Sequence, residues 1–87
     1  MAEHKLLCVT WVDSRKSGNI FTPEEMKKFF CVIIQTVGWG YELEDRVILA
    51  SEYYRDIPDT QAEGYREVCC IPKECIKQII ELKEGTE

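Results

Sequence analysis

Apolar and β-branched residues recur in five short runs along the chain, separated by polar turns. The first run, residues 5–13, reads Lys-Leu-Leu-Cys-Val-Thr-Trp-Val-Asp, with no helical periodicity. Four more runs have the same character and predict strands at residues 31–41, 46–51, 65–71 and 76–82. The last run is ambiguous, because its apolar residues also fit a helical face, but three isoleucines in five residues favour a strand.

The segments between the runs carry turn and helix-start signals. Residues 13–19 form a polar stretch that predicts a surface loop, and Ile20-Phe21 is expected to return to the core. Thr22-Pro23-Glu24-Glu25 has a cap residue, a proline at the first helical position and acids in the first turn, which predicts a short helix. Residues 42–45 predict a hairpin turn, and residues 56–64 predict a polar loop.

Two special positions shape the predicted strands. Gly38 and Gly40 flank Trp39, which predicts a bulge or a sharp bend. Ile71-Pro72 ends a run, and the next apolar run begins soon after, so the chain is expected to make a one-turn helix before its last strand.

The first run is apolar on both of its faces. Strand alternation places Leu7, Val9 and Trp11 on one side, and the residues between them on the other, with neither side plainly polar. We therefore expect part of the sheet to be covered, either by the short helix or by another subunit.

Five short strands with a one-turn helix before the last one resemble an SH3-like barrel. The chain also resembles a group of small uncharacterised phage and prophage proteins, through Trp11 and Asp13, Val37-Gly38, and Ile71-Pro72 with its terminal apolar segment. The chain differs from that group at Ile20-Phe21, because the group usually has a glycine-tryptophan pair at these positions. The resemblance implies a phage origin and a small five-stranded barrel, and it implies no activity. The predicted organisation is one domain over residues 1–87, with an ordered core of about residues 5–82.

Composition narrows the function classes. The 87 residues include 16 acidic and 11 basic side chains, a net charge of −5, which disfavours a phosphate-binding surface and hence a nucleic-acid partner. No apolar run is long enough for a bilayer, and no leader precedes the first strand, so a cytoplasmic location in a bacterial host is expected. Five cysteines, an odd number, fit reduced thiols, and we expect them to be buried as small hydrophobic residues.

The sequence offers no catalytic or metal-binding set. The cysteines lack the paired spacing of structural zinc sites, and adjacent Cys69 and Cys70 are expected on opposite faces of a strand. The single histidine, His4, falls in a terminus that is expected to fray and so makes a poor general base. We therefore predict a protein that is not an enzyme and has no cofactor.

Exposed aromatic and charged residues are the candidates for binding. We select a set of six, made up of Trp11, Asp13, Trp39, Tyr53, Tyr54 and Arg55. The first hypothesis is an interaction protein that recognises a protein partner or associates with itself. The alternative is an oligomer that sequesters a nucleotide signal and so counters host defence, with Arg15, Lys16, Arg55 and Arg66 as the anion-binding residues. A third possibility, an acidic decoy, requires negative charge on one face, whereas the sequence scatters it.

Overall fold

The computed structural model describes residues 3–60 and 62–83 and is mainly β. Its elements follow the order β1 (Lys5–Asp13), α1 (Pro23–Lys27), β2 (Val32–Glu42), β3 (Arg46–Ile57), β4 (Ala62–Pro72), the 3-10 turn η1 (Lys73–Cys75) and β5 (Ile76–Glu81). No helix among the described residues is long and apolar enough to cross a membrane.

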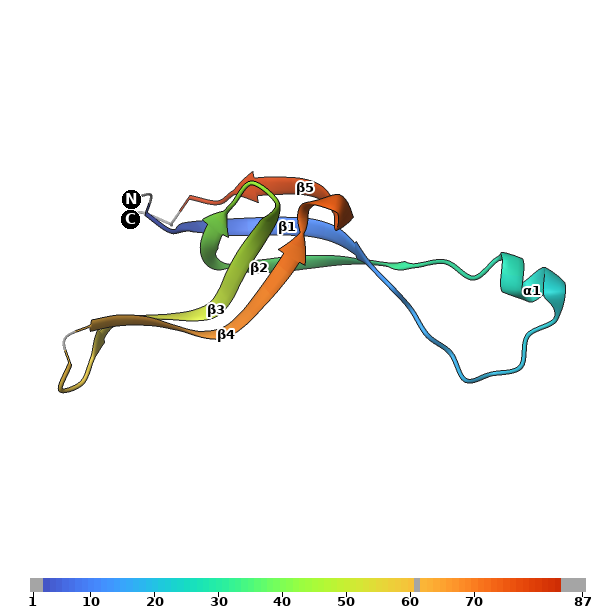
Figure 1. Cartoon of the computed structure of the whole chain (residues 1–87), viewed down its shortest axis with the longest axis horizontal. Helices are drawn as coiled ribbons and strands as arrows, with labels where there is room; N and C mark the ends of the chain where they lie inside the picture. Colours follow the sequence, from blue (N-terminus) through green and yellow to red (C-terminus); the bar gives the residue numbers. More distant parts are fainter. Residues whose placement is uncertain (1–2, 61, 84–87) are drawn as a thin grey trace.

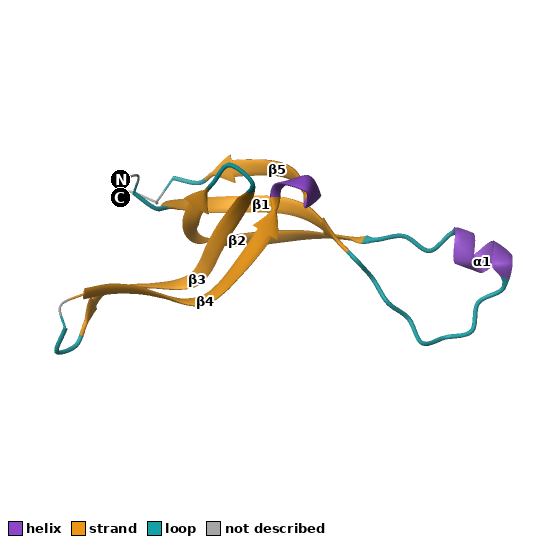
Figure 2. Ribbon diagram, viewed as in Figure 1, coloured by secondary structure: helices purple, strands orange, loops and turns teal. Residues whose placement is uncertain are grey.

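The five strands form one antiparallel sheet in the order β4-β3-β2-β1-β5 (Figures 1 and 2). The sheet curls without closing, and within the described residues no ladder joins its edge strands β4 and β5. The prediction of a mainly β fold of five strands is therefore confirmed, together with the helical turn before the last strand.

The last apolar run is a strand, as its isoleucines predict. β5 pairs antiparallel with β1, with Ile79 opposite Val9 and Ile80 opposite Cys8. Pro72 is the last residue of β4 and precedes η1, so the chain leaves one edge strand and reaches the other through a single turn.

The expected polar loop at residues 56–64 is wrong, because most of it belongs to a long hairpin. β3 continues to Ile57 and β4 begins at Ala62. The extension has cross-strand partners that the sequence pattern does not reveal, since Tyr53 lies opposite Tyr65 and Glu52 opposite Arg66. Asp59, with a φ of 70°, lies in the turn that reverses the chain.

Gly38 and Gly40 let β2 approach β3 closely. A Cβ atom on Gly40 would overlap the carbonyl oxygen of Ile48, and one on Gly38 would lie 2.6 Å from that of Ala50. β2 pairs with β1 up to Gly40 and with β3 from Trp39 onward, so the glycines lie where the strand passes from one neighbour to the other. The predicted bend thus corresponds to a close approach of two backbones.

The core is small and lies on one face of the sheet. Leu7, Val9, Val47, Leu49 and Ile71 form it, and each is at most 3% exposed. The partly buried side chains that pack against this core are Trp11, Ile76 and Ile79.

Residues 14–31, called the arm below, project away from the sheet with α1 at the tip (Figure 1). The expectation that Ile20-Phe21 returns to the core is wrong, because Ile20 is fully exposed. Helix α1 has no buried residue and does not cover β1, so the first of the two expected covers, the short helix, is wrong. The β3–β4 hairpin projects in the opposite direction, and the chain measures 58 × 30 × 26 Å with a radius of gyration of 17.4 Å. A compact chain of this length would have a radius of about 12 Å.

Replacing Gly40 by alanine should destabilise the protein by about 3 kcal/mol, because the new methyl group meets the β3 backbone, which cannot move without breaking the ladder. Urea denaturation followed by circular dichroism measures the loss. The matched control is Gly18→Ala, since nothing lies within 4 Å of a Cβ at Gly18. Equal midpoints for the two variants would contradict the close approach.

Candidate functional site

Four aromatic rings from three strands surround the imidazole of His4. We call this group, His4 with Trp39, Tyr41, Tyr53 and Tyr65, the aromatic cluster. The ring centroids lie 4.3 Å from His4 for Tyr53, 5.5 Å for Trp39, 5.6 Å for Tyr65 and 6.5 Å for Tyr41. All four contacts are edge-to-face, the arrangement that aromatic quadrupoles favour.

Hydrogen bonds connect the polar atoms of the aromatic cluster. The His4 Nδ1 and the Tyr65 hydroxyl share a hydrogen bond of 2.6 Å, and the hydroxyls of Tyr65 and Tyr41 share one of 3.1 Å. The Tyr53 hydroxyl donates to Glu63 Oε2 at 2.6 Å. Every hydroxyl of the cluster therefore has a partner within the protein.

These contacts keep two phenols protonated to high pH. The hydrogen bond to the Glu63 carboxylate, followed by burial and the charge of Glu63, raises the pKa of Tyr53. The hydrogen bond with Tyr41, followed by burial, raises the pKa of Tyr65 well above its usual range. Both side chains therefore present neutral, electron-rich rings under ordinary conditions.

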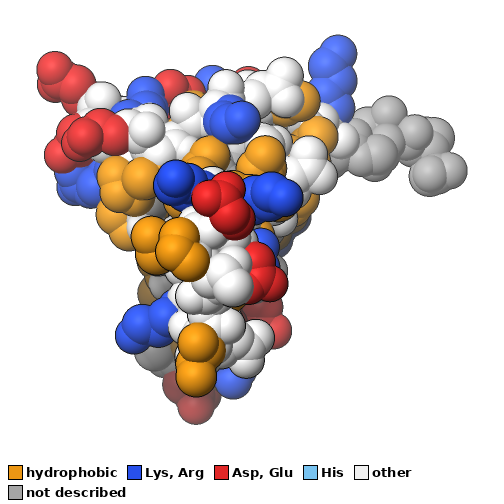
Figure 3. Space-filling view, turned by 90° about the vertical axis from the view of Figure 1, so that its right-hand side faces the viewer, with side chains coloured by type: hydrophobic (Ala, Val, Ile, Leu, Met, Phe, Trp, Pro, Cys, Tyr) orange, Lys and Arg blue, Asp and Glu red, His pale blue; other side chains and the backbone are white. Residues whose placement is uncertain are grey.

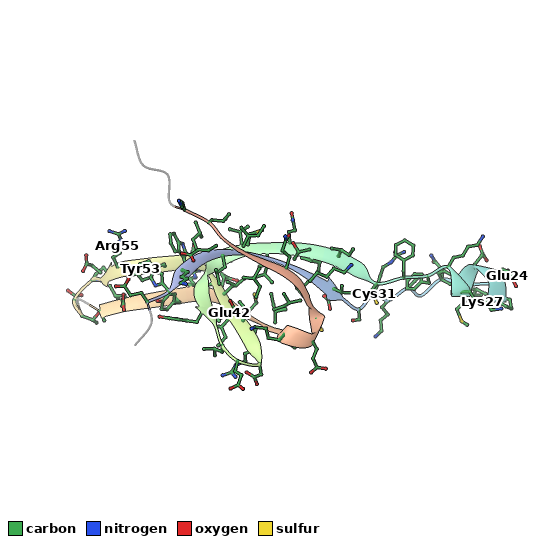
Figure 4. All side chains as sticks on the ribbon, turned by 90° about the horizontal axis from the view of Figure 1, so that it is seen from above. Glu24, Lys27, Cys31, Glu42, Tyr53 and Arg55 are labelled. Carbon is green, nitrogen blue, oxygen red and sulfur yellow. The ribbon has the colours of Figure 1, made fainter. Side chains whose placement is uncertain are left out.

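A hollow of about 1050 Å³ opens beside the aromatic cluster. Its wall includes Trp39, Tyr41 and Tyr53 together with His4, and its charged residues are three acids and three bases, Glu3, Glu63, Glu81, Lys5, Arg55 and Lys83. Two of these lining residues, Lys5 and Glu81, form an ion pair at 3.4 Å between Lys5 Nζ and Glu81 Oε1. Figure 4 shows Tyr53 and Arg55 at the end of the molecule opposite Glu24 and Lys27 of α1.

The structure brings three of the six predicted binding residues to this hollow, namely Trp39, Tyr53 and Arg55. Tyr54 does not line it. Its hydroxyl instead donates to Glu52 Oε1 at 3.1 Å and accepts from Arg66 at 3.5 Å.

The other two predicted residues lie on β1, away from the hollow. Trp11 packs against the core, and its Nε1 donates to Thr36 Oγ1 at 2.9 Å. Asp13 ends β1, and its Oδ1 accepts from the backbone nitrogen of Ser14.

Sequence reasoning missed four residues that complete the aromatic cluster and its hydrogen bonds. His4 was expected in a fraying terminus, but its ring is half-buried among the aromatics because β1 begins directly after it. Tyr41 lies near the end of β2, Tyr65 is the first residue of the predicted fourth strand, and Glu63 lies in the part of β4 that extends that strand. Residues 62–65 show no alternation of apolar and polar side chains, so the local pattern gives no signal for a strand there.

The arm exposes apolar side chains while keeping a defined local structure. Ile20, Met26 and Phe30 are 100%, 64% and 71% exposed. A capping box joins Thr22 and Glu25, in which the Thr22 hydroxyl accepts from the Glu25 backbone and the Glu25 carboxylate accepts from the Thr22 backbone. These hydrogen bonds lower the pKa of the Glu25 carboxyl group.

A small aromatic contact orders the arm further. The guanidinium carbon of Arg15 lies 4.3 Å from the centroid of the Phe29 ring, and Phe21 meets Phe29 edge-to-face at 5.3 Å. Figure 3, seen from the arm's end of the molecule, shows hydrophobic side chains exposed among lysines and arginines.

The cysteines are not the buried residues that were expected. Cys31, Cys69 and Cys70 are exposed and Cys8 and Cys75 are half-buried, all as free thiols. An open sheet leaves both faces of its edge strand β4 accessible, which accounts for Cys69 and Cys70. Partial burial raises the pKa of the Cys69 thiol. Among the described residues, no three acidic, histidine or cysteine side chains gather in a way that could hold a metal ion.

The four basic residues that the nucleotide hypothesis requires do not lie close together within one copy of the chain. Arg15 and Lys16 belong to the arm, whereas Arg55 lies at the opposite end beside the hollow. Arg66 forms an ion pair with Glu52 at 3.6 Å.

Comparison of the chain with known protein families, curated proteins and solved structures finds no match.

Replacing Glu63 by glutamine should lower the pKa of Tyr53 toward its usual value near 10, because the charged acceptor is lost. Absorbance of tyrosinate at 295 nm during a pH titration measures this change. Glu74→Gln on η1 is the control, since Glu74 is not among the groups that shift the pKa of Tyr53.

The raised pKa values also determine how stability depends on high pH. A phenol whose pKa is raised by folding stabilises the native state below the unfolded pKa of about 10, and this contribution is lost as pH rises through the folded value. The urea concentration at the midpoint of unfolding should therefore decrease as the pH rises above 10 in the wild type. The decrease should be smaller in Tyr65→Phe. Identical pH dependence in both proteins would contradict the assignment.

Proposed function

We propose that the protein is a non-catalytic interaction protein that associates with itself through the arm. The observation that carries this proposal is the exposure of Ile20, Met26 and Phe30 on a locally ordered segment that contributes nothing to the core. Apolar groups held in one geometry and left in water are typical of an interaction surface. The arm has its shape before any partner binds, which lowers the entropic cost of association.

Surface area supports an assembly of more than one copy. The chain exposes 7343 Å², whereas a compact monomer of its mass would expose about 5300 Å². The difference exceeds the roughly 800 Å² that one partner contributes to a standard interface. The chain therefore has area to bury without any loss from its own core.

The charge distribution favours a second copy as the occupant. The arm carries four basic and two acidic residues, a net charge of +2, while the rest of the chain carries seven basic and fourteen acidic residues, a net charge of −7. An arm packed on the sheet of another copy brings opposite charges together, whereas an arm packed on another arm does not.

The sheet offers a matching apolar row. Val37, Cys8 and Ile80 lie side by side on β2, β1 and β5, and Val37 and Ile80 are 52% and 44% exposed. The sequence predicts that part of the sheet is covered, because β1 is apolar on both of its faces, and this row lies on one of them. Since α1 does not cover it, a neighbouring subunit is the remaining candidate.

The SH3-like barrel and the phage origin stay predictions from resemblance. What favours a barrel-like packing is the strand order, with β1 between β2 and β5, and the single turn η1 between β4 and β5. The nucleotide-sequestering alternative also stays a prediction. It requires the arm of one copy to bring Arg15 and Lys16 to the hollow of another.

Size-exclusion chromatography with light scattering tests self-association. The wild type should have a mass above 10.2 kDa that falls on dilution, and Ile20→Asp with Phe30→Asp should shift it to the monomer, because two charges enter the apolar contact. The matched control is Val68→Asp on β4, an equally polar change at an exposed valine away from the arm. A strictly monomeric wild type would overturn the proposal.

A further inference from the structure

The aromatic cluster has the form of a cage whose interior is already occupied by His4. The four rings approach the imidazole at interplanar angles between 69° and 88°, so none of them stacks on it. Tyr53 and Tyr65 stack on each other instead, at 5.3 Å and 29°. The cage therefore encloses a compact group from several directions, and the parallel pair leaves no slot for a flat base between its rings.

The walls of this cage supply π faces and few free hydrogen-bonding groups. The hydroxyl of Tyr53 is bonded to Glu63, and the hydroxyls of Tyr41 and Tyr65 are bonded to each other. A guest that needs several hydrogen bonds would leave them unmade, which is costly in a partly desolvated site. Aromatic walls whose tyrosine hydroxyls are already hydrogen-bonded suit a cation that has no N–H donors, because the ring quadrupoles attract it directly.

The charges around the cage are consistent with such a guest. The carboxylate of Glu63 accepts a hydrogen bond from the Tyr53 hydroxyl, so negative charge lies at the edge of the wall. Among the basic residues of the hollow, Lys5 is paired with Glu81. Arg55 and Lys83 also line the hollow, which carries equal numbers of acids and bases, so the preference for a cation rests on the aromatic walls and on Glu63 beside Tyr53.

We propose that the aromatic cluster is a binding site for a quaternary or fully methylated ammonium group, and that His4 occupies the cage until such a cation displaces it. His4 can leave without breaking the sheet, because the β1 ladder begins at Lys5. Its loss opens a space bounded by Trp39, Tyr41, Tyr53 and Tyr65. This inference does not depend on self-association through the arm.

Isothermal titration of the full chain with choline tests the proposal, with 3,3-dimethyl-1-butanol as the uncharged analogue of the same shape. Choline should bind at least tenfold more tightly than the alcohol. Equal binding of both compounds, or no binding of choline, would overturn a cation site. Tighter binding of a mononucleotide than of choline would also overturn it.

Variants identify the site. Trp39→Leu should weaken choline binding at least tenfold, because it removes one wall of the cage, while Tyr54→Leu should leave binding unchanged, since Tyr54 lies outside the hollow. Tyr65→Phe gives a second measurement if Trp39→Leu fails to fold. This variant keeps the aromatic ring and loses only the hydroxyl, so its choline binding should be retained or strengthened. Loss of binding in Tyr54→Leu to the same extent as in Trp39→Leu would overturn the placement of the site.

The role of His4 has its own readout. His4→Ala should bind choline several-fold more tightly than the wild type, because the cage no longer holds an internal occupant. Weaker binding would overturn the role of His4 as a displaceable occupant. A peptide containing trimethyl-lysine, compared with free choline, separates a protein-borne cation from a small molecule, and tenfold tighter binding of either one identifies the source.

Discussion

The close approach of β2 to β3 at Gly38 and Gly40 is the constraint on which the rest of the structure depends. The residues of β2 before Trp39 pair with β1 alone, and from Trp39 onward β2 pairs with β3. A side chain on either glycine would separate the two backbones. Since Trp39 and Tyr41 alternate with these glycines, the backbone contact also determines where two walls of the aromatic cluster stand.

The same contact allows a small core to organise a long molecule. Five side chains from three strands, β1, β3 and β4, are nearly or fully buried around the place where β2 bends, and outside it the structure continues as paired strands and as the arm. Ladder hydrogen bonds and cross-strand contacts such as Tyr53 with Tyr65 then hold segments that have no interior of their own. The two proposed binding surfaces, the arm and the hollow beside the aromatic cluster, lie toward opposite ends of the molecule.

Much of this arrangement can be predicted from local patterns. β1 has the predicted bounds of residues 5–13, and the cap at Thr22 and the turn after Pro72 lie where their residues indicate. The extension of β3 and β4 could not be predicted in the same way, since residues 56–64 are rich in turn formers, and pairing across the hairpin is a property of two segments together. The site residue His4 was missed for a similar reason, because its neighbours come from strands that follow it by 35 to 61 residues.

The separation of the arm from the core has a consequence for how the sequence can change over evolution. No side chain of the arm is part of the buried cluster, so substitutions there alter the free energy of unfolding very little. Selection on the arm can therefore act on recognition almost independently of selection on folding. A chain built in this way could acquire a new partner by changing exposed residues of the arm, while the sheet and its glycine contact stay as they are.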